Sequence, residues 1–500
     1  MAILPIVCLI VLMAFLRVAG DRSSVVTLLV TAALALWGFH YPAHDLAFSF
    51  LYGATKAITP ILLIILMAIF SYNTLLLTGK MEIIKSQFSS ISSDRSVQVL
   101  LLTWGFGGLL EAMAGFGTAV AIPAAILISL GYKPVFAAVS CLIANSVATA
   151  FGAIGTPVIV LATETGLPVN DLSADVVLQL APLMFIIPFI IVFLTDGSKK
   201  ALPKNILLSV IVGGVSLVGQ YASAKYMGAE SPAIVGSLLS IIVIIIFSRF
   251  CHTKEEGKGE VEISKPSFSA GALLNAWSVY LLILFLVVIT SPLFPQLRGA
   301  LNSVCVTTLH FTVHGVEKPY AINWLTHAGV LLFIGTFVGG LIQGASAGAL
   351  FSTLWKTICQ LRKTFVTVIC LVGLSTIMDH AGMIGVIAGG LAAATGGLYP
   401  LFAPLVGAIG TFITGSDTSA NILFGKMQAT VAGQVGVPAD WLSAANTVGA
   451  TGGKMISPQS IAIATSACNL QGKEGQIMKS ALPYALLYIV VAGIVVYCFV

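Results

Sequence analysis

Residues Gly415–Asn421 read "GSDTSAN", a run of small and polar residues between the apolar stretches Gly407–Thr414 and Ile422–Phe424. Inside hydrocarbon, backbone that leaves a helix survives only where protein or a watery cavity satisfies its amides. Small residues allow helices to pack closely, but aspartate is not a packing residue. The stretch therefore predicts a broken helix that lines a polar cavity inside a membrane.

The rest of the chain supports a membrane location. Of its 500 residues, 58% are hydrophobic and 9% are charged, whereas soluble domains are about 45–50% apolar and about 25% charged. Apolar runs that can cross about 30 Å of hydrocarbon as helices recur from end to end. The clear ones are Ser23–Phe39, Ala57–Thr78, Val176–Thr195, Pro232–Phe250, Ala270–Thr290, Gly329–Leu350 and Ser480–Val500. We expect an all-α polytopic membrane protein in a lipid bilayer, with about 12–14 transmembrane helices.

An internal repeat pairs this break with a second one about 300 residues earlier. Each copy has a break, then an Asn motif, then a proline at the same spacing from the asparagine. The copies are "GFGT" (Gly115–Thr118), "ANSVAT" (Ala144–Thr149) and Pro157, and "GSDT" (Gly415–Thr418), "ANTVGAT" (Ala445–Thr451) and Pro458. Paired breaks at matching places are the best sequence pointer to a transporter site.

Charged loops indicate that the two copies run in opposite directions. The turn "GYKP" (Gly131–Pro134) is basic, and the matching turn "GVPAD" (Gly436–Asp440) is acidic. Basic loops stay in the cytoplasm, so we expect the copies to form an inverted-topology repeat, with the loop Ser291–Thr326 outside. We expect a first membrane half at 1–248, a hydrophilic cytoplasmic linker at 249–267 and a second half at 268–500.

Broken helices direct free N–H groups and the positive end of the helix dipole at the site, which suits an anion. All six arginines lie in loops or at segment ends, so a small monoanion fits better than a di- or tricarboxylate. The alternative is that the glycines only allow close helix packing. The expected substrate-binding residues are Gly115, Phe116, Gly117, Asn145, Ser146, Gly415, Ser416, Thr418, Asn446, Thr447, Lys454, Ser457 and Gln459.

Charges inside the apolar segments are few, and each costs about 2.5–3.5 kcal/mol at mid-bilayer. They are Glu111, Asp379, Asp417, Lys426 and Lys454. The candidates for the residues that bind the coupled proton are Glu111, Asp417 and Asp379. A structural ion pair, such as Glu111 with Lys454, is the alternative, and Asp379 at a helix end could be merely interfacial.

Other functional classes find little support. The eight cysteines are scattered, without a CxxC motif or a Cys/His cluster, so we expect buried free thiols and no metal. The apolar segments carry no Ser/His/Asp grouping and no nucleotide loop. We therefore expect no cofactor, no enzymatic activity and no nucleic-acid partner.

Three stretches resemble the most characteristic segments of the L-lactate permease family, a branch of the ion-transporter superfamily, and the resemblance spans the whole chain. They are "LLEAMAGFGTAVAIPAAILISLGYKP" (Leu109–Pro134), "GAIGTFITGSDTSANILFGKMQ" (Gly407–Gln428) and "AANTVGATGGKMISPQSIAIA" (Ala444–Ala464). The last is long and highly specific. Two departures stand out: Asp379–His380 stands where family members carry uncharged polar residues, and Lys426 lies in a stretch that they often leave uncharged.

The resemblance implies a secondary transporter that imports L-lactate, and often D-lactate or glycolate, with protons across a prokaryotic plasma membrane. It also implies two inverted repeats, re-entrant helical hairpins, alternating access by elevator movement, and homodimers. Sodium-coupled carboxylate carriers of the same superfamily leave sodium as an alternative, since Asn145, Ser146, Asn446 and Thr447 could supply oxygens. Protons are favoured because buried carboxyl groups such as Glu111 and Asp417 can exchange a proton near neutral pH. A channel or sensor for the same anion is the rival class.

Overall fold

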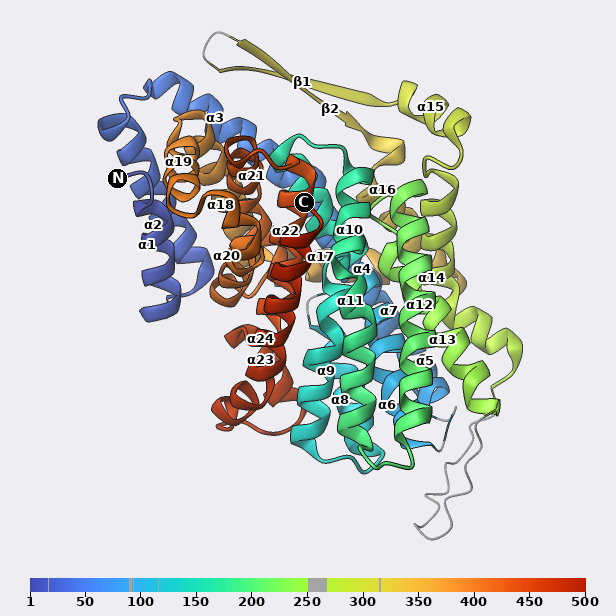
Figure 1. Cartoon of the computed structure of the whole chain (residues 1–500). Coiled ribbons are helices and arrows are strands. Elements are labelled where there is room, and N and C mark those ends of the chain that lie inside the picture. The colour runs from blue at the N-terminus through green and yellow to red at the C-terminus, as the bar shows by residue number, and fades with distance from the viewer. Residues whose placement is uncertain (17, 90–91, 93, 116, 251–267, 314–315) are drawn as a thin grey trace.

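The computed structural model describes every residue except 17, 90–91, 93, 116, 251–267 and 314–315. Most of the described chain is helical (Figure 1). The first half contains α1 (Leu4–Ile10), α2 (Gly20–Ala33), α3 (Ala43–Lys56), α4 (Leu63–Leu77), α5 (Lys80–Ser89), α6 (Arg95–Leu100), α7 (Gly107–Met113), α8 (Thr118–Ser129), α9 (Pro134–Thr149), α10 (Gly152–Thr165), α11 (Val169–Thr195), α12 (Leu202–Tyr226) and α13 (Pro232–Phe250). The second half contains α14 (Ala270–Ile289), α15 (Pro295–Ser303), β1 (Val306–Val313), β2 (Val316–Asn323), α16 (Ala328–Ile342), α17 (Ala347–Gln360), α18 (Arg362–His380), α19 (Met383–Thr395), α20 (Tyr399–Thr414), α21 (Asp417–Val435), α22 (Ala439–Lys454), α23 (Pro458–Ala467) and α24 (Glu474–Cys498). The π-helical segments η3 (Ala57–Leu62) and η4 (Leu101–Phe106) join α3 to α4 and α6 to α7.

Nine helices of the described chain are long and apolar enough to cross a membrane, or ten if the bent pair α9–α10 counts as one span. Shorter apolar helices are present as well: Leu4–Met13, Thr118–Ser129 and Ala328–Ile342. The expected class, a multi-pass α-helical membrane protein, is confirmed. The sequence predicted about 12–14 transmembrane helices, and the described chain has nine or ten candidate spans beside these three shorter apolar helices.

One expected apolar run, Gly329–Leu350, is divided into two helices. α16 ends at Ile342, and Gly344 takes a φ of 93°, a conformation that glycine adopts at little cost. Ser346 then caps α17 by accepting a hydrogen bond from the backbone N–H of Ala349 at 3.2 Å. Local turn chemistry thus overrides the continuous apolar pattern.

The first predicted break is the tip of a helical hairpin. Between α7 and α8, Gly115 and Gly117 have φ values of 62° and 83°, which glycine tolerates and other residues seldom do. At the open end, the Tyr132 hydroxyl donates to the backbone oxygen of Arg95 at 3.2 Å and to Gln98 Oε1 at 3.0 Å. These bonds join the start of the first arm to the end of the second, so both arms enter from one side.

The second predicted break has the same form. Gly415, between α20 and α21, has a φ of 73°. Ser416 caps α21 by accepting a hydrogen bond from the backbone N–H of Ser419 at 3.3 Å. Near the open end, the Tyr399 hydroxyl of α20 donates to Gln428 Oε1 of α21 at 2.9 Å. The two arms are therefore held together away from their tip.

Each half also contains a helix broken after its Asn motif. α9 and α10 meet at a 47° bend, and α22 is separated from α23 by a short turn in which Ser457 caps α23. The second arm of each hairpin packs on the half-helix beyond the break of the other half, α8 on α23 and α21 on α10. The two halves therefore interlock around one centre, with buried apolar clusters on both sides of it.

The turns that follow the two hairpins lie at opposite ends of the helical body. Trp441 lies just after the second turn, Gly436–Asp440. Its backbone oxygen accepts a hydrogen bond of 2.7 Å from Nε2 of Gln179, in the N-terminal half of α11. Past the C-terminal end of α11, Lys204 Nζ lies 2.5 Å from Asp94 Oδ2. Asp94 caps α6, beside Tyr132 of the first turn.

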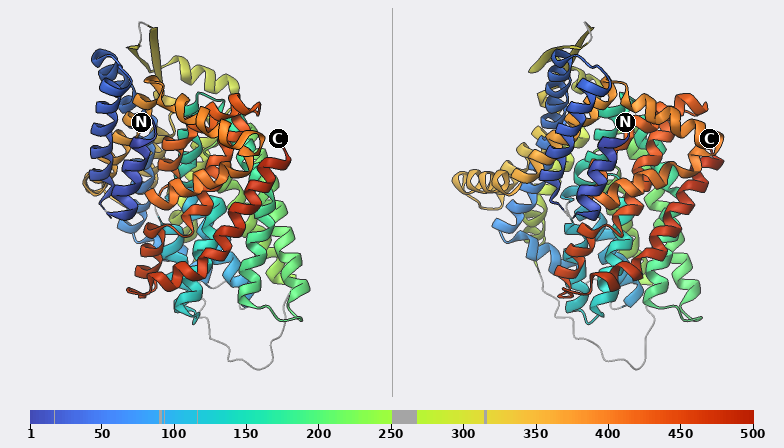
Figure 2. Two further views of the ribbon diagram at one scale, coloured as in Figure 1. Left: turned by 60° about the vertical axis from the view of Figure 1, so that its left-hand side comes forward. Right: turned by 90° about the vertical axis from the view of Figure 1, so that its left-hand side faces the viewer.

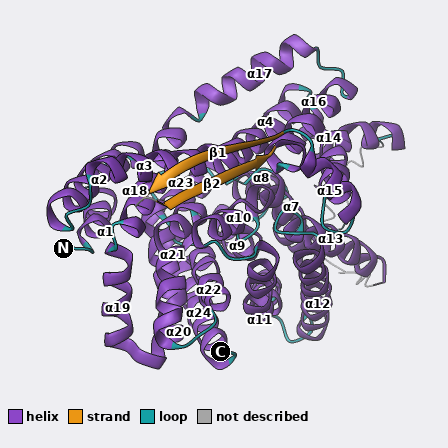
Figure 3. Cartoon of the chain, turned by 90° about the horizontal axis from the view of Figure 1, so that it is seen from above, coloured by secondary structure: helices purple, strands orange, loops and turns teal. Residues whose placement is uncertain are grey.

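The segment expected to be a long outer loop, Ser291–Thr326, contains α15 and the antiparallel pair β1–β2. The two strands lie across one end of the helical body in both side views and from above (Figures 2 and 3). The alternating, β-branched sequence "VTTLHFTV" of β1 suits a strand. Tyr52 of α3 packs edge-on against Phe311 and Tyr320 of the strands, with ring centroids 5.4 and 6.2 Å away.

Candidate functional site

A cavity of about 100 Å³ lies where the two hairpin tips meet the two helix breaks. Helix N-termini present unpaired N–H groups and the positive end of the helix dipole, so the start of four helices around one cavity favours an anion. The lining residues from these starts are Gly117 before α8, Gly152, Ala153 and Thr156 of α10, Ser416, Asp417 and Thr418 at the start of α21, and Gln459 and Ser460 of α23.

The size of the cavity limits what it can hold. One ordered water needs about 10–15 Å³ of such space, so about 100 Å³ admits a solute of only a few heavy atoms. Hydroxyl and amide groups make up much of the wall, among them those of Asn145, Thr149 and Thr156. A small polar anion fits this combination of size and lining.

One ion pair crosses the cavity wall between the two halves. Lys454 Nζ, at the end of α22, lies 2.6 Å from Glu111 Oε1 of α7. The side chains are 16% and 2% exposed, so water screens this pair little. The pairing that the sequence offered as the structural alternative is thus present, and it lines the cavity.

Asp417 lies in the same wall without a hydrogen-bonding partner. Its residue is 3% exposed, and both carboxylate oxygens are buried with no partner in the described chain. Glu111 Oε2 is in the same state. Asp417 interacts electrostatically with Lys454 and with Glu111. Among the described residues of the lining, one lysine therefore interacts with two carboxyl groups.

Most of the predicted site residues line this cavity. They are Glu111, Gly115, Gly117, Asn145, Ser146, Gly415, Ser416, Asp417, Thr418, Lys454 and Gln459. The amide oxygen of Asn145 is buried and has no partner in the described chain. Phe116 was also predicted, but it lies outside the described residues.

Asn446 and Thr447 do not line the cavity but lie in a buried network between α21 and α22. Asn446 Nδ2 donates to Asn421 Oδ1 at 2.9 Å, and Asn421 Nδ2 donates to Thr447 Oγ1 at 2.7 Å. Gln428 Nε2 donates to Asn446 Oδ1 at 3.3 Å. Ser457 is similarly occupied by capping α23. In the second half, the Asn motif of α22 is therefore hydrogen-bonded to α21, the second arm of the hairpin.

Some residues that line the cavity were not predicted from the sequence. Thr149 follows Asn145 by four positions on α9, which puts both on one helix face, so the motif itself carried that signal. Ile65 of α4 and Ile463 of α23 also line the cavity. Nothing distinguishes these two from the many apolar residues around them in the sequence.

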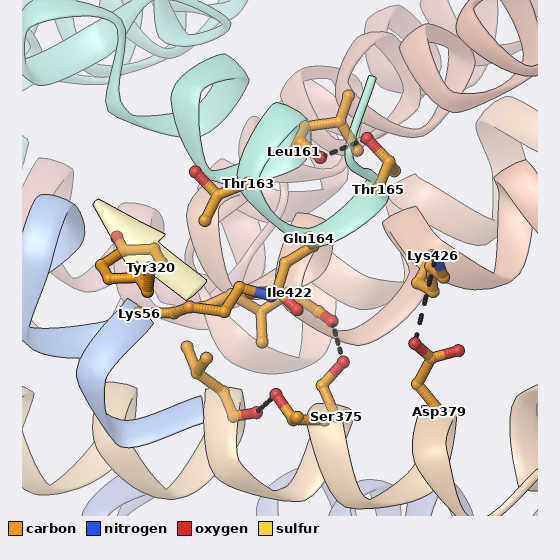
Figure 4. Close-up of polar contacts among 12 residues, drawn as sticks. Lys56, Leu161, Thr163, Glu164, Thr165, Tyr320, Ser375, Asp379, Ile422 and Lys426 are labelled. Atoms are coloured by element: carbon orange, nitrogen blue, oxygen red, sulfur yellow. Dashed lines mark hydrogen bonds and ion pairs between the residues drawn. The ribbon is translucent and has the colours of Figure 1, made fainter. Parts of the chain in front are cut away.

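A second group of charges lies between two helix pairs (Figure 4). Lys56 Nζ of α3 lies 3.1 Å from Glu164 Oε1 of α10, with side chains 8% and 3% exposed. Asp379 Oδ2 of α18 lies 4.0 Å from Lys426 Nζ of α21, so this predicted residue does not line the cavity. α3 packs with α18, and α10 packs with α21. Each ion pair thus crosses from one helix pair to the other, and the two have opposite polarity.

This group contains two buried charges that the sequence analysis did not single out. Glu164 lies in the last turn of α10 and is 7% exposed. Lys56 was not among the expected intramembrane charges, yet it is 6% exposed. Each charge borders an apolar run, and its partner lies more than a hundred residues away, so the pairing could not be seen locally.

A larger cavity of about 480 Å³ lies beneath β2 and is lined in part by Lys56, Tyr320 and His327. Burial lowers the pKa of His327 to about 4, so its ring is neutral at pH 7. Its Nδ1 accepts a hydrogen bond from the backbone N–H of Gly329 at 3.1 Å. The one lysine of this lining is already paired with Glu164. The central cavity, where the starts of four helices meet, favours an anion more than this one.

Known proteins resemble this chain along its full length. A family model described as L-lactate permease matches residues 1–500. The L-lactate permease of Streptococcus iniae is 43% identical over 444 residues, which cover 89% of this chain and 93% of the relative. The glycolate permease GlcA of Escherichia coli (strain K12) is 33% identical over 529 residues, covering 99% and 94%. The L-lactate permease of Bacillus subtilis (strain 168) is 32% identical over 537 residues, covering 99% and 94%.

A solved structure shares the fold. The YdaH transporter of Alcanivorax borkumensis, described as having an unusual topology, aligns with a TM-score of 0.51 at 14% identity. The alignment covers 90% of this chain and 87% of that one. At this identity the likeness shows the fold alone.

Proposed function

The chain belongs to the L-lactate permease family, and we propose that it imports L-lactate and related 2-hydroxy monocarboxylates, including D-lactate and glycolate, by proton symport with alternating access. Membership of a permease family makes it a transporter rather than an enzyme. Its bacterial relatives support a location in the plasma membrane of a prokaryote.

The observation that carries the proposal is the single lysine shared by two carboxyl groups between the hairpin tips. Among the described residues of the cavity lining, Lys454 is the one basic residue, so it is the natural anchor for a substrate carboxylate. The N-termini of the helices around Lys454 add backbone N–H donors for the anion without adding another charged side chain. Asn145, Ser146 and Thr418 supply polar groups for the carboxylate or the 2-hydroxyl.

Competition for Lys454 explains how substrate and proton would be coupled. Glu111 Oε1 lies 2.6 Å from Lys454 Nζ. A substrate carboxylate that takes the lysine leaves Glu111 buried without a cation, which costs several kcal/mol. A proton on Glu111 removes this cost. Asp417, which has no hydrogen-bonding partner in the described chain, fits the site best when it stays protonated throughout.

The test is uptake of labelled L-lactate into liposomes that contain the purified protein. An inward-directed proton gradient should drive accumulation at equal sodium on both sides. Accumulation that ignores the pH gradient and follows a sodium gradient would refute proton coupling while leaving lactate transport intact.

Sodium coupling is a second candidate because two residues of the cavity lining, Asp417 and Asn145, have oxygens without partners in the described chain. Both carboxylate oxygens of Asp417 and the amide oxygen of Asn145 are buried without partners in the described chain, and alkali cations bind to such oxygens. An anion channel or sensor for the same substrates is a third. Unlabelled lactate inside the liposomes should accelerate uptake through a carrier, whereas a channel shows no such counterflow.

The architecture that we propose consists of two inverted repeats, 1–248 and 268–500, joined by a cytoplasmic linker, 249–267, most of which lies outside the described residues. The opposite placement of the two hairpin turns supports it, as does the reciprocal packing of α8 on α23 and α21 on α10. The basic turn would face the cytoplasm and β1–β2 the exterior. A homodimer and an elevator movement follow from the family resemblance and remain predictions, as does a coupling role for Asp379.

A further inference from the structure

We propose that Ile463 of α23 sets the size limit for the substituent on the 2-carbon of the substrate, and so separates glycolate, lactate and longer 2-hydroxy acids. The inference rests on the proposed function, since it names the residue that would select among the proposed substrates. Ile463 belongs to the apolar part of the cavity wall, which has no role in the proposed coupling of proton and substrate.

Ile463 lies against the tip of the first hairpin. A Cβ atom added to Gly117 would lie 2.5 Å from Ile463 Cδ1 and 3.2 Å from its Cγ2, closer than real side chains approach. The isoleucine thus occupies the space that a side chain at the tip would need. One turn earlier on the same face of α23, Gln459 stands in the same relation to Gly415 of the second tip. α23 therefore bridges the two tips with one polar and one apolar side chain.

Among the large aliphatic residues of the lining, Ile463 alone keeps a half-buried side chain. Ile65, Val120 and Leu142 also line the cavity, but they are only 3%, 2% and 2% exposed. Their surfaces are already covered by neighbouring helices. A substituent that seeks apolar contact in the cavity therefore finds accessible surface mainly at Ile463.

The polar and apolar parts of the wall would orient a 2-hydroxy acid. Its carboxylate would pair with Lys454, and its hydroxyl would meet the amide and hydroxyl groups of α9. The remaining substituent, a hydrogen in glycolate and a methyl in lactate, would turn toward Ile463. A hydrophobic pocket distinguishes one methylene by about 10–200-fold, and in a cavity of about 100 Å³ one side chain can decide whether an ethyl group enters.

The experiment measures competition against uptake of labelled glycolate in liposomes, with unlabelled L-lactate and L-2-hydroxybutyrate as competitors. Shortening the side chain in Ile463→Ala should strengthen inhibition by 2-hydroxybutyrate relative to lactate by about 10-fold. Ile463→Val, which removes one methyl group and keeps the branched shape, should give a smaller change in the same direction. The two variants are compared with the wild type by the ratio of the two inhibition constants, which does not depend on how fast each protein takes up glycolate.

Ile461 provides the matched control. It lies two positions away on α23, is 1% exposed and belongs to the apolar core rather than to the cavity lining. Ile461→Val should leave the ratio of the two inhibition constants unchanged. An unchanged ratio in Ile463→Val and Ile463→Ala proteins that still take up glycolate would overturn the inference. A wild-type protein that takes up none of the three acids would instead refute the transport proposal itself.

Discussion

Glu111→Gln is the substitution that most directly tests the competition for Lys454. Glutamine has nearly the same shape and can still accept a hydrogen bond from the lysine, but it carries no charge and binds no proton. A one-unit pH gradient stores about 1.4 kcal/mol per proton, which corresponds to about tenfold accumulation at one proton per substrate. The wild-type protein should reach this ratio, and the variant should equilibrate lactate without concentrating it.

The variant should nevertheless fold and bind. Removing one partner of a buried ion pair costs about 3–5 kcal/mol when the other charge is left alone. Here the neutral hydrogen bond returns about 0.5–1.5 kcal/mol, and the carboxyl group of Asp417 lies close enough to interact with Lys454. We expect exchange of labelled for unlabelled lactate to continue, with equal or tighter binding, since the substrate no longer displaces a carboxylate from the lysine.

The assay compares accumulation under a pH gradient with exchange at equal pH in the same liposomes. Glu82→Gln is the control, since Glu82 forms an ion pair of 2.7 Å with Lys85, but its side chain is 72% exposed. Exposed pairs contribute little, so this variant should behave as wild type. A Glu111→Gln protein that still concentrates lactate about tenfold would refute the coupling mechanism and leave Glu111 a structural residue.

Three further predictions concern other buried groups. Asp417→Asn should keep pH-driven accumulation, because asparagine replaces a carboxyl group that is protonated throughout the cycle; loss of accumulation with intact exchange would make Asp417 the proton carrier. Lys56→Glu should lower thermal stability, as expected for a broken buried pair worth about 3–5 kcal/mol, and the swap Lys56→Glu with Glu164→Lys should restore much of it; no recovery would show that the pair itself contributes little. The lowered pKa of His327, about 4 against about 6.5 in unfolded chains, means that the unfolded state binds more protons between these values, so stability should fall as pH decreases through this window. His327→Asn, which keeps an acceptor for the Gly329 N–H, should flatten the pH dependence of the melting temperature, and an unchanged profile would contradict the assignment.

Much of the central site was predictable because its residues are of types that are rare inside apolar segments. Asp417 and Glu111 stand out in apolar stretches, and Gly117 and Gly415 mark turns that need positive φ. Such residues are costly in a membrane unless they meet a cavity, so their positions carry information about function. The matching spacing of the two copies then indicated that the breaks belong together.

The roles of the two Asn motifs and the pairing of the buried charges could not be predicted, because they depend on contacts between residues far apart in the sequence. Asn446 belongs to a motif like that of Asn145, yet it bonds to Asn421 and Gln428, while the Asn145 oxygen faces the cavity without a partner in the described chain. Packing around each copy decides this difference. The pairing of Lys56 with Glu164 likewise depends on how α3 and α10 meet.

The opposite polarity of the two ion pairs between the helix pairs has a consequence for the driving force. α10 and α21 carry Glu164 and Lys426, one negative and one positive charge, and the facing pair α3 and α18 carries Lys56 and Asp379. If one helix pair slides against the other, these side chains carry no net charge through the membrane field, which is worth about 2.3 kcal/mol per charge at 100 mV. Lactate with one proton is also neutral overall. The proposed cycle would therefore be electrically silent, driven by the pH difference and indifferent to the membrane voltage.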